Sequence, residues 1–269
     1  MQRHAGPLAK EFMHRGVVTV LNESKVGAAV GEMDRLNIGS VVLVDSLGPC
    51  GVFTERDLIS RVLAKGKDHR TTLLSEAASP KFPSISSSLT LAETACAMVE
   101  RKSRLMVFEG PDLVGMVTPT DVVKVLKGID ADFSILKVMS TRIVTARPET
   151  PVEVVVRLMD VHKTGSVLVT DDSRWIGIFT ERDLVKRVLA KDRKLDTPVG
   201  EVATSPVVTA EPGIFGREAA GIMALHGFKR LPLALEGDGV GIVTARDIVE
   251  AFATANKPSA PRVDWVQWN

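Results

Sequence analysis

In the third quarter of the chain, short apolar runs typical of strands are followed by apolar residues three or four positions apart, as in helices. The pattern therefore predicts strands and helices in a fixed order. Residues 143–145 are extended, and apolar residues then recur at helical spacing over 152–159 until Gly165 ends the helix. Two apolar runs within 166–179 form strands joined by a turn, and Thr180 begins a second helix. The unit is therefore strand, helix, strand, strand, helix over about 55 residues.

The same order of elements occurs four times. The stretch GVFTERDLISRVLAKGK begins at Gly51 and GIFTERDLVKRVLAKDR begins at Gly177, with twelve of seventeen positions identical. Weaker copies begin at Gly115 (GMVTPTDVVKVL) and Gly241 (GIVTARDIVEAF), so successive glycines lie 64, 62 and 64 residues apart. A period of this length indicates a repeat protein. We expect four repeats and a tail, at 8–70, 71–128, 135–195, 196–255 and 256–269.

The repeats fall into two kinds. Repeats one and three share the tetrapeptide TERD and have Gly-Ser before the middle strand, whereas repeats two and four have a basic residue there. A unit of this size buries little surface and is expected to pair with another. The larger period is therefore two repeats, which predicts modules at 8–128 and 135–255 joined by GIDADFS at 128–134.

The overall composition excludes several classes of protein. The net charge of +1 gives no general attraction to nucleic acid or to an acidic membrane, and the longest apolar runs are too short to cross a bilayer. The two cysteines, Cys50 and Cys96, lie far apart without a C-x-x-C pattern, and the five histidines are scattered. We therefore expect a cytoplasmic protein with no disulfide, no metal site and no membrane attachment.

Each repeat has a threonine followed three residues later by an aspartate, at the start of its last helix. One interpretation is a capping box, in which these side chains satisfy the first amides of the helix. The other is a binding site, because a carboxylate held there can accept hydrogen bonds from the two hydroxyls of a ribose. A helix start beside an arginine also suits phosphate. The spacing alone leaves both interpretations open.

The unit, with its closing G-h-h-T-x-x-D-h-h (h apolar), resembles the cystathionine-β-synthase (CBS) domain, and the chain resembles four of them in two Bateman modules. It is similar to archaeal stand-alone four-CBS proteins and to the gamma subunit of AMP-activated protein kinase. The resemblance implies an α/β fold, two modules that pack into a pseudo-fourfold disc, and adenine nucleotides bound through the threonine and aspartate.

The resemblance also implies that each site takes its threonine and aspartate from one repeat and its base contacts from the first strand of the paired repeat. The residues so implied form four groups: Thr54, Arg56 and Asp57 with Arg104; Thr118 and Asp121 with Val17 and Val18; Thr180, Arg182 and Asp183 with Val207, Val208, Lys229 and Arg230; and Thr244, Arg246 and Asp247 with Ile143, Val144 and Ser166. Lys229 and Arg230 make the third group the most basic, so we expect Asp183 to bind phosphorylated nucleotide most tightly.

These features favour a non-catalytic regulatory protein that binds AMP, ADP or ATP and signals to an effector protein of unknown identity. A homodimer is compatible with the sequence. One alternative is a ligand such as S-adenosylmethionine, and another is a scaffold that binds protein or RNA without sensing nucleotides. The near-neutral charge and the absence of tyrosine argue against RNA. Each repeat supplies one acid per site and no fixed His or Cys partner, so we expect no catalysis.

A few single residues carry further expectations. Pro232 predicts a strand with one unpaired edge. Met13, Met139 and Met223 are expected in the core. The two tryptophans of the tail are expected either to pack on the body or to dock a partner; they are Trp265 and Trp268.

Overall fold

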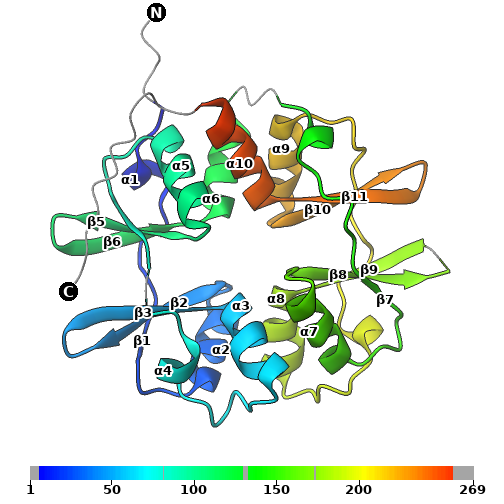
Figure 1. Cartoon of the computed structure of the whole chain (residues 1–269), viewed down its shortest axis with the longest axis horizontal. Helices are drawn as coiled ribbons and strands as arrows, with labels where there is room; N and C mark the ends of the chain where they lie inside the picture. The colour runs from blue at the N-terminus through cyan, green and yellow to red at the C-terminus, as the bar shows by residue number, and fades with distance from the viewer. Residues whose placement is uncertain (1–5, 81, 130–132, 173, 257–269) are drawn as a thin grey trace, which may run out of the picture. The chain divides into compact units, whose positions relative to one another are not determined.

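The structure is a computed structural model that describes residues 6–80, 82–129, 133–172 and 174–256 (Figure 1). The predicted α/β fold of four repeats is confirmed, and the second helix of every repeat begins at the predicted threonine. The tail tryptophans, Trp265 and Trp268, lie outside the described residues, as does part of the segment at 128–134. Within the described ranges no helix is long and apolar enough to cross a membrane.

Repeats one and three have matching elements. In repeat one they are α1 (Ala9–Phe12), β1 (Thr19–Leu21), α2 (Val26–Arg35), β2 (Ser40–Asp45), β3 (Gly48–Thr54), α3 (Glu55–Asp57), a π-helical turn (Leu58–Val62) and a 3-10 turn (Leu63–Lys65). In repeat three they are a 3-10 turn (Ile135–Lys137), β7 (Thr145–Ala146), α7 (Val152–Val161), β8 (Ser166–Asp171), β9 (Arg174–Thr180), α8 (Glu181–Asp183), a π-helical turn (Leu184–Val188) and a 3-10 turn (Leu189–Lys191).

Repeats two and four end in a regular α-helix instead. The elements of repeat two are α4 (Leu74–Ala77), β4 (Ser84–Ser86), α5 (Leu91–Arg101), β5 (Leu105–Glu109), β6 (Asp112–Val117) and α6 (Pro119–Leu126). Those of repeat four are a 3-10 turn (Val199–Glu201), α9 (Gly216–His226), β10 (Arg230–Leu235), β11 (Asp238–Thr244) and α10 (Ala245–Ala255).

The sheets are small and mixed. In the first three repeats the first strand pairs parallel with the second, and the second pairs antiparallel with the third, giving β1-β2-β3, β4-β5-β6 and β7-β8-β9. The fourth repeat has the antiparallel pair β10-β11, and its first strand is reduced to a parallel bridge between Ala210 and Leu233.

Pro232 explains the shorter sheet of the fourth repeat. In the other repeats a middle-strand amide donates to the first strand at 2.9 Å, as the N–H of Val42 does to the carbonyl of Val18. Pro232 stands at the matching place in β10 and has no N–H to donate. Its carbonyl still accepts from the amide of Ala210 at 3.1 Å. The unpaired edge expected from the sequence is therefore limited to one missing hydrogen bond.

The chain forms two compact units, and each combines two repeats that are not consecutive. The odd-repeat unit consists of Val18–Lys81 and Ile143–Val207. The even-repeat unit consists of Met1–Val17, Phe82–Arg142 and Val208–Asn269. The chain passes from one unit to the other just before the first strand of each repeat. Comparison of the four repeats with one another grouped consecutive repeats and did not predict these shared cores. The pseudo-fourfold disc implied by the family resemblance stays a prediction.

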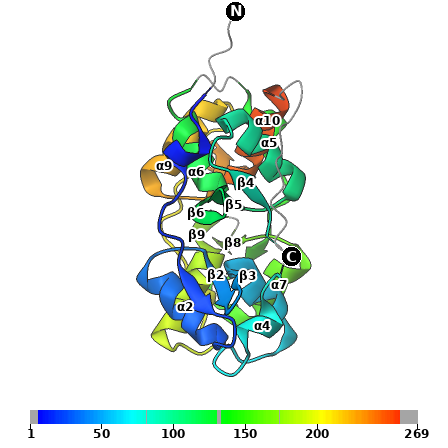
Figure 2. The same ribbon diagram turned by 90° about the vertical axis from the view of Figure 1, so that its left-hand side faces the viewer.

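Each unit has its own apolar core between helices of its two repeats. In the odd-repeat unit α2 packs on the helical turns that follow α8, and α7 packs on those that follow α3. In the even-repeat unit α5 packs against α10, and α6 against α9, as Figure 2 also shows for α5 and α10. The helical spacing predicted over 152–159 is confirmed, since Val152, Val155, Val156 and Met159 are all buried.

The prediction that Gly165 ends the first helix of repeat three is wrong. Helix α7 ends at Val161, and the residue with left-handed backbone is Lys163 (φ 52°). Repeat one uses Asn37 in the same way (φ 54°). Asparagine accepts this conformation more readily than lysine does. The sequence signal was misread because glycine is the usual left-handed residue after a helix.

The glycine that opens each repeated phrase lies against neighbouring backbone. A Cβ atom on Gly51 would come 3.0 Å from the carbonyl oxygen of Ser79, and one on Gly115 would come 2.8 Å from that of His14. Gly177 and Gly241 are similarly close to the chain segment that leads into another repeat. A glycine is therefore favoured where this strand passes close to the backbone of another segment.

The three methionines expected in the core are placed there to different degrees. Met223 is 1% exposed, which confirms its prediction. Met13 and Met139 are partly buried against the core of the even-repeat unit. Their sulfur atoms lie over Gly115 and Gly241, at 2.6 and 3.0 Å from the position of a Cβ atom.

Candidate nucleotide site

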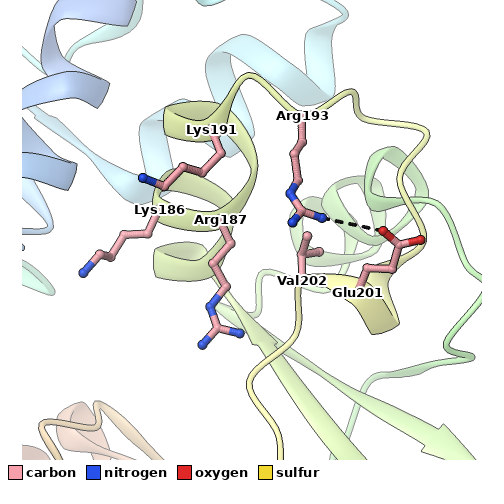
Figure 3. Close-up of a pocket in the computed structure, with 6 residues that line it drawn as sticks. All are labelled: Lys186, Arg187, Lys191, Arg193, Glu201 and Val202. Carbon is pink, nitrogen blue, oxygen red and sulfur yellow. Dashed lines mark ion pairs between the residues drawn. The ribbon is translucent and has the colours of Figure 1, made fainter.

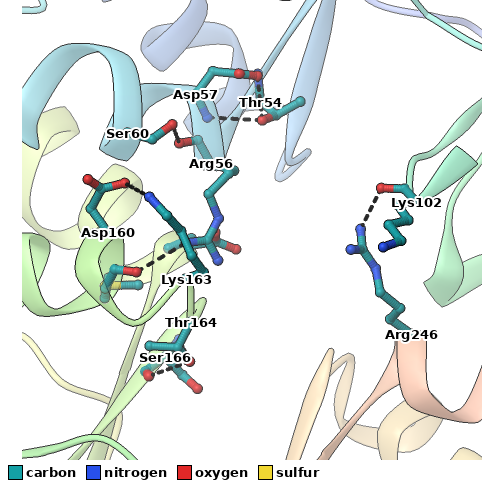
Figure 4. Close-up of polar contacts among 12 residues, drawn as sticks. Thr54, Arg56, Asp57, Ser60, Lys102, Asp160, Lys163, Thr164, Ser166 and Arg246 are labelled. Atoms are coloured by element: carbon teal, nitrogen blue, oxygen red, sulfur yellow. Dashed lines mark hydrogen bonds and ion pairs between the residues drawn. The ribbon is translucent and has the colours of Figure 1, made fainter.

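The threonine and aspartate of each T-x-x-D motif form a capping box at the start of a helix. In repeat one the backbone N–H and the Oγ1 hydroxyl of Thr54 donate to Oδ2 of Asp57, at 3.0 and 2.6 Å (Figure 4). In repeat three the same two bonds join Thr180 to Asp183 at 2.9 and 2.6 Å. The interpretation of the motif as a capping box is thus confirmed. The cap uses one of the two carboxylate oxygens, Oδ2.

The other carboxylate oxygen, Oδ1, has partners that differ between the repeats. In repeat one Oδ1 of Asp57 lies 3.3 Å from Nε of Arg61. In repeat three Oδ1 of Asp183 lies 3.3 Å from Nε of Arg187 and also accepts the hydroxyl of Thr204 at 2.9 Å. Because Oδ1 takes no part in the cap, it can exchange partners without ending the helix.

In repeat two a histidine lies beside the corresponding oxygen. Nδ1 of His14 is 3.8 Å from Oδ1 of Asp121, and the His14 side chain is 64% exposed. This contact is weak because 3.8 Å is longer than a hydrogen bond and the imidazole is largely exposed to water. Oδ1 of Asp121 is therefore less firmly held than Oδ1 of Asp183.

Three of the four aspartates are buried. Asp57, Asp121 and Asp183 are 6–7% exposed, and Asp247 is half-buried. An ionised carboxylate only accepts hydrogen bonds, and a buried one needs donors to offset its lost hydration. The geometry is therefore suited to a ligand that brings hydroxyl donors.

The arginine four residues after the aspartate is a feature that the sequence interpretation missed. Nη1 of Arg61 donates to the carbonyl of Ala78 at 2.7 Å, and Nη1 of Arg187 donates to that of Ala203 at 2.7 Å. Each arginine thus ties its aspartate to the segment that leads into the next repeat. The signal was the i, i+4 spacing of Asp and Arg in the odd repeats, which the even repeats lack.

Two other contacts had no local signal in the sequence. Thr204 reaches Asp183 because its backbone is bridged to Ile178, and His14 reaches Asp121 because its backbone is bridged to Met116. Both bridges join segments that are far apart in the chain. They depend on tertiary pairing and not on spacing.

The arginines that directly precede the aspartates lie against the neighbouring repeat of the same unit. Arg56 pairs with Glu181 at 2.9 Å, and Arg182 pairs with Glu55 at 3.1 Å. Arg246 donates to the carbonyl of Lys102 at 3.1 Å (Figure 4). Their expected role in binding nucleotide stays a prediction.

The residues implied by the family resemblance are divided between the two units. The odd-repeat unit holds Thr54, Arg56, Asp57, Thr180, Arg182, Asp183, Val18, Ile143, Val144, Ser166 and Val207. The even-repeat unit holds Thr118, Asp121, Thr244, Arg246, Asp247, Val17, Val208, Arg104, Lys229 and Arg230. Val18 and Val144 lie at strand edges as expected, with carbonyls that accept from the middle strand at 2.9 Å. The grouping of these residues into four sites stays a prediction.

A basic hollow of about 490 Å³ lies beside Arg187 on repeat three (Figure 3). Arg193 on its wall pairs with Glu201 at 3.6 Å. The ends of Lys186 and Lys191 point away from Arg193, so the cations do not converge on one point. Among the described residues no group of three or more His, Cys, Asp or Glu side chains is placed to hold a metal ion.

The fold and these capped carboxylates define the class of protein: an α/β protein of four tandem strand-helix-strand-strand-helix repeats. The chain belongs to the CBS domain family, whose model matches residues 9–64, 74–128, 135–190 and 199–254. The uncharacterized protein MJ1404 of Methanocaldococcus jannaschii is 23% identical over 270 residues, which cover 92% of this chain and 62% of that protein. The CBS domain-containing protein YhcV of Bacillus subtilis is 31% identical over 115 residues, 43% of this chain and 82% of that protein.

Solved structures share the fold over nearly the whole chain. Protein MJ1225 of Methanocaldococcus jannaschii, described as a proposed archaeal homolog of γ-AMPK, has a TM-score of 0.79 at 17% identity and covers 92% of this chain and 100% of its own. An uncharacterized conserved protein of Pyrococcus horikoshii has a TM-score of 0.64 at 20% identity, covering 91% and 100%. At these identities the likeness concerns the fold.

Proposed function

We propose that this chain is a non-catalytic regulatory protein that binds adenine nucleotides (AMP, ADP or ATP) through the aspartates of its T-x-x-D motifs. The observation that carries the proposal is that the two carboxylate oxygens of an aspartate have different partners, most clearly at Asp183. One carboxylate oxygen starts the helix, and Oδ1 faces partners that a ligand hydroxyl can replace. The description of MJ1225 as a proposed γ-AMPK homolog supports the same class of ligand.

Ribose binding at Asp183 would proceed by exchange of hydrogen bonds. A ribose hydroxyl takes the place of Thr204 or of Arg187 at Oδ1, while Thr180 keeps the helix capped through Oδ2. A charge-assisted hydrogen bond of this kind contributes about 1.5–3 kcal/mol. Oδ1 of Asp183 has two partners that the ligand can replace. The evidence for an exchangeable oxygen is therefore strongest at this aspartate.

The remaining parts of the nucleotide follow the family resemblance. For the Asp183 site the resemblance implies a base against Val207, and the expectation that this site is the tightest rests on the two basic residues of its group, Lys229 and Arg230. Nucleotide binding shifts the equilibrium between two conformations of the chain. The size of this shift is limited by the difference between the ligand's affinities for the two conformations. An effector protein in the cytoplasm responds to this shift by binding one conformation in preference to the other.

Catalysis is not part of the proposal. In the described residues each candidate site has its aspartate as the acid, because Glu55 and Glu181 pair with arginines of the opposite odd repeat. The groups next to the aspartates are arginine, threonine and an exposed histidine. None of these is arranged as a nucleophile with a base. S-adenosylmethionine also carries a ribose, so it competes as a ligand. A protein scaffold without a nucleotide is the remaining alternative.

Mass spectrometry of the small molecules released when freshly purified protein is denatured tests the proposal. We expect AMP, ADP or ATP in a fixed ratio to the chain, and calorimetric titration of the emptied protein should return the same ligand. Release of S-adenosylmethionine would change the ligand and keep the site. If no adenosine compound is released and none binds at millimolar concentration, the nucleotide proposal is wrong and the scaffold alternative stands.

A further inference from the structure

The Glu-Arg dipeptide inside TERD contacts its own copy in the other odd repeat. Nε of Arg56 lies 2.9 Å from Oε1 of Glu181, and Nε of Arg182 lies 3.1 Å from Oε1 of Glu55. Both ion pairs lie within the odd-repeat unit, where α3 contacts α8. We refer to Glu55, Arg56, Glu181 and Arg182 as the reciprocal cluster.

The acids of the reciprocal cluster are buried, but its two pairs differ. Nε of Arg182 donates a hydrogen bond to Oε1 of Glu55, whereas Arg56 and Glu181 form an ion pair without hydrogen-bond geometry at Oε1. The side chains of Glu55 and Glu181 are 5% and 10% exposed, and those of Arg56 and Arg182 are 34% and 29% exposed. Each arginine also contacts the C-terminal end of a helix in the opposite repeat. Nη1 of Arg56 donates to the carbonyl of Met159 in α7 at 3.3 Å, and Nη1 of Arg182 donates to that of Asn37, just after α2, at 3.1 Å. Separating such a pair is costly because a buried carboxylate would lose its charge partner.

The cluster shares its helical turns with the candidate ligand carboxylates. Glu55 and Arg56 directly precede Asp57 in α3, and the same order holds in α8. The position of α3 depends on the capping bonds between Thr54 and Asp57. A ligand at Oδ1 leaves these bonds in place and displaces Arg61, which lies in the turn Leu58–Val62 directly after α3. That turn packs on α7, the helix whose Met159 carbonyl accepts from Arg56, so its movement reaches the other odd repeat. The same holds for Arg187, whose turn packs on α2.

We propose that the reciprocal cluster couples ligand binding at Asp57 to ligand binding at Asp183. This inference rests on the proposed function and adds a regulatory link between two of its sites. Occupation of one site changes the affinity of the other, and the factor is equal in both directions because coupling free energies are reciprocal. The two odd repeats then respond to nucleotide as one cooperative pair.

The even repeats provide a natural comparison. At the positions of Glu-Arg they have Pro119-Thr120 and Ala245-Arg246, and neither dipeptide contains an acid. Arg246 donates to the carbonyl of Lys102 at 3.1 Å instead. Among the described residues, α6 and α10 therefore lack a reciprocal pair of this kind. We expect Asp121 and Asp247 to bind ligand independently of each other.

Calorimetric titration with AMP, ADP and ATP in turn tests the coupling. The full chain carrying Asp121→Asn and Asp247→Asn has weakened even-repeat sites, and the nucleotide is kept at concentrations at which only unmodified sites fill. In this background the affinity at Asp183 is measured with the Asp57 site able to fill and with Asp57→Asn blocking it, and then in the opposite order. We expect a difference of about fivefold or more, equal in both orders.

A second set of variants assigns the coupling to the cluster. Glu55→Gln with Glu181→Gln removes the acid of both pairs and keeps the two arginines, which are expected at the nucleotide sites, so it should bring the coupling factor close to one while both sites still bind. Arg70→Gln with Asp192→Asn is the matched control and should leave the factor unchanged, because this exposed ion pair also joins repeats one and three but lies outside the motifs. A merely structural cluster would lower the melting temperature and both affinities equally, with the factor unaltered.

The outcomes separate this inference from the proposed function. Nucleotide binding with equal affinities in the filled and blocked states would overturn the coupling and leave the proposed function intact. An unaltered factor in the neutral double variant would overturn the role of the cluster. Absence of binding by all three nucleotides would overturn both. The first comparison keeps the cluster intact, so it decides the question even if a cluster variant does not fold.

Discussion

Asp183→Asn is expected to weaken AMP binding by about 10- to 100-fold while the protein stays folded. The amide oxygen can still accept the N–H and hydroxyl of Thr180, so the helix keeps its cap. The substitution removes the charge that strengthens the hydrogen bonds from a ribose, and losing about 1.5–3 kcal/mol gives the expected factor. Isothermal titration measures the affinity, and circular dichroism checks the fold.

The control for this prediction is an acid of the same unit outside the motif. Asp160 lies on α7 and pairs with Lys163 at 3.0 Å, so Asp160→Asn should leave AMP affinity unchanged. Asp57→Asn should weaken binding less than Asp183→Asn, since we expect Asp183 to be the tightest site. Unchanged affinity and stoichiometry in Asp183→Asn would show that the motif only starts a helix.

Sequence periodicity predicted the elements because their causes are local. The spacing of Val152, Val155, Val156 and Met159 already describes the buried face of α7, and the T-x-x-D spacing already describes a cap. The end of α7 was missed because Lys163 takes a conformation that glycine usually takes. Local pattern therefore defines the strands and helices well, and their ends less well.

The environment of the aspartates was harder to predict because its causes are tertiary. Arg187 follows Asp183 at a helical interval and could have been found from the sequence. Thr204 could not, because only the bridge between its backbone and Ile178 brings it there. The contacts of the reciprocal cluster are also tertiary. The motif TERD was recognised from the sequence, but its Glu and Arg form contacts between repeats one and three, which the motif alone did not predict. Identical tetrapeptides 126 residues apart were the signal of a symmetric contact.

Gly115→Ala is expected to lower the free energy of unfolding by about 1–3 kcal/mol. The new Cβ atom would lie 2.8 Å from the carbonyl oxygen of His14 and 2.6 Å from Sδ of Met13. The methionine side chain can move. The backbone of His14 is less free, because it exchanges two hydrogen bonds with Met116 at 2.8 and 3.0 Å. The strand must therefore separate from this segment, which weakens both bonds. Denaturant unfolding followed by circular dichroism measures the loss.

Gly221→Ala is the matched control for this prediction, since it makes the same chemical change in the same unit. Gly221 lies inside α9, and a Cβ atom there meets nothing within 4 Å. Alanine favours a helix over glycine by about 1 kcal/mol, so this variant should be as stable as the wild type or more stable. The two glycines thus differ in the sign of the expected effect. If both substitutions shift stability equally, close backbone approach does not explain why a glycine opens each repeated phrase.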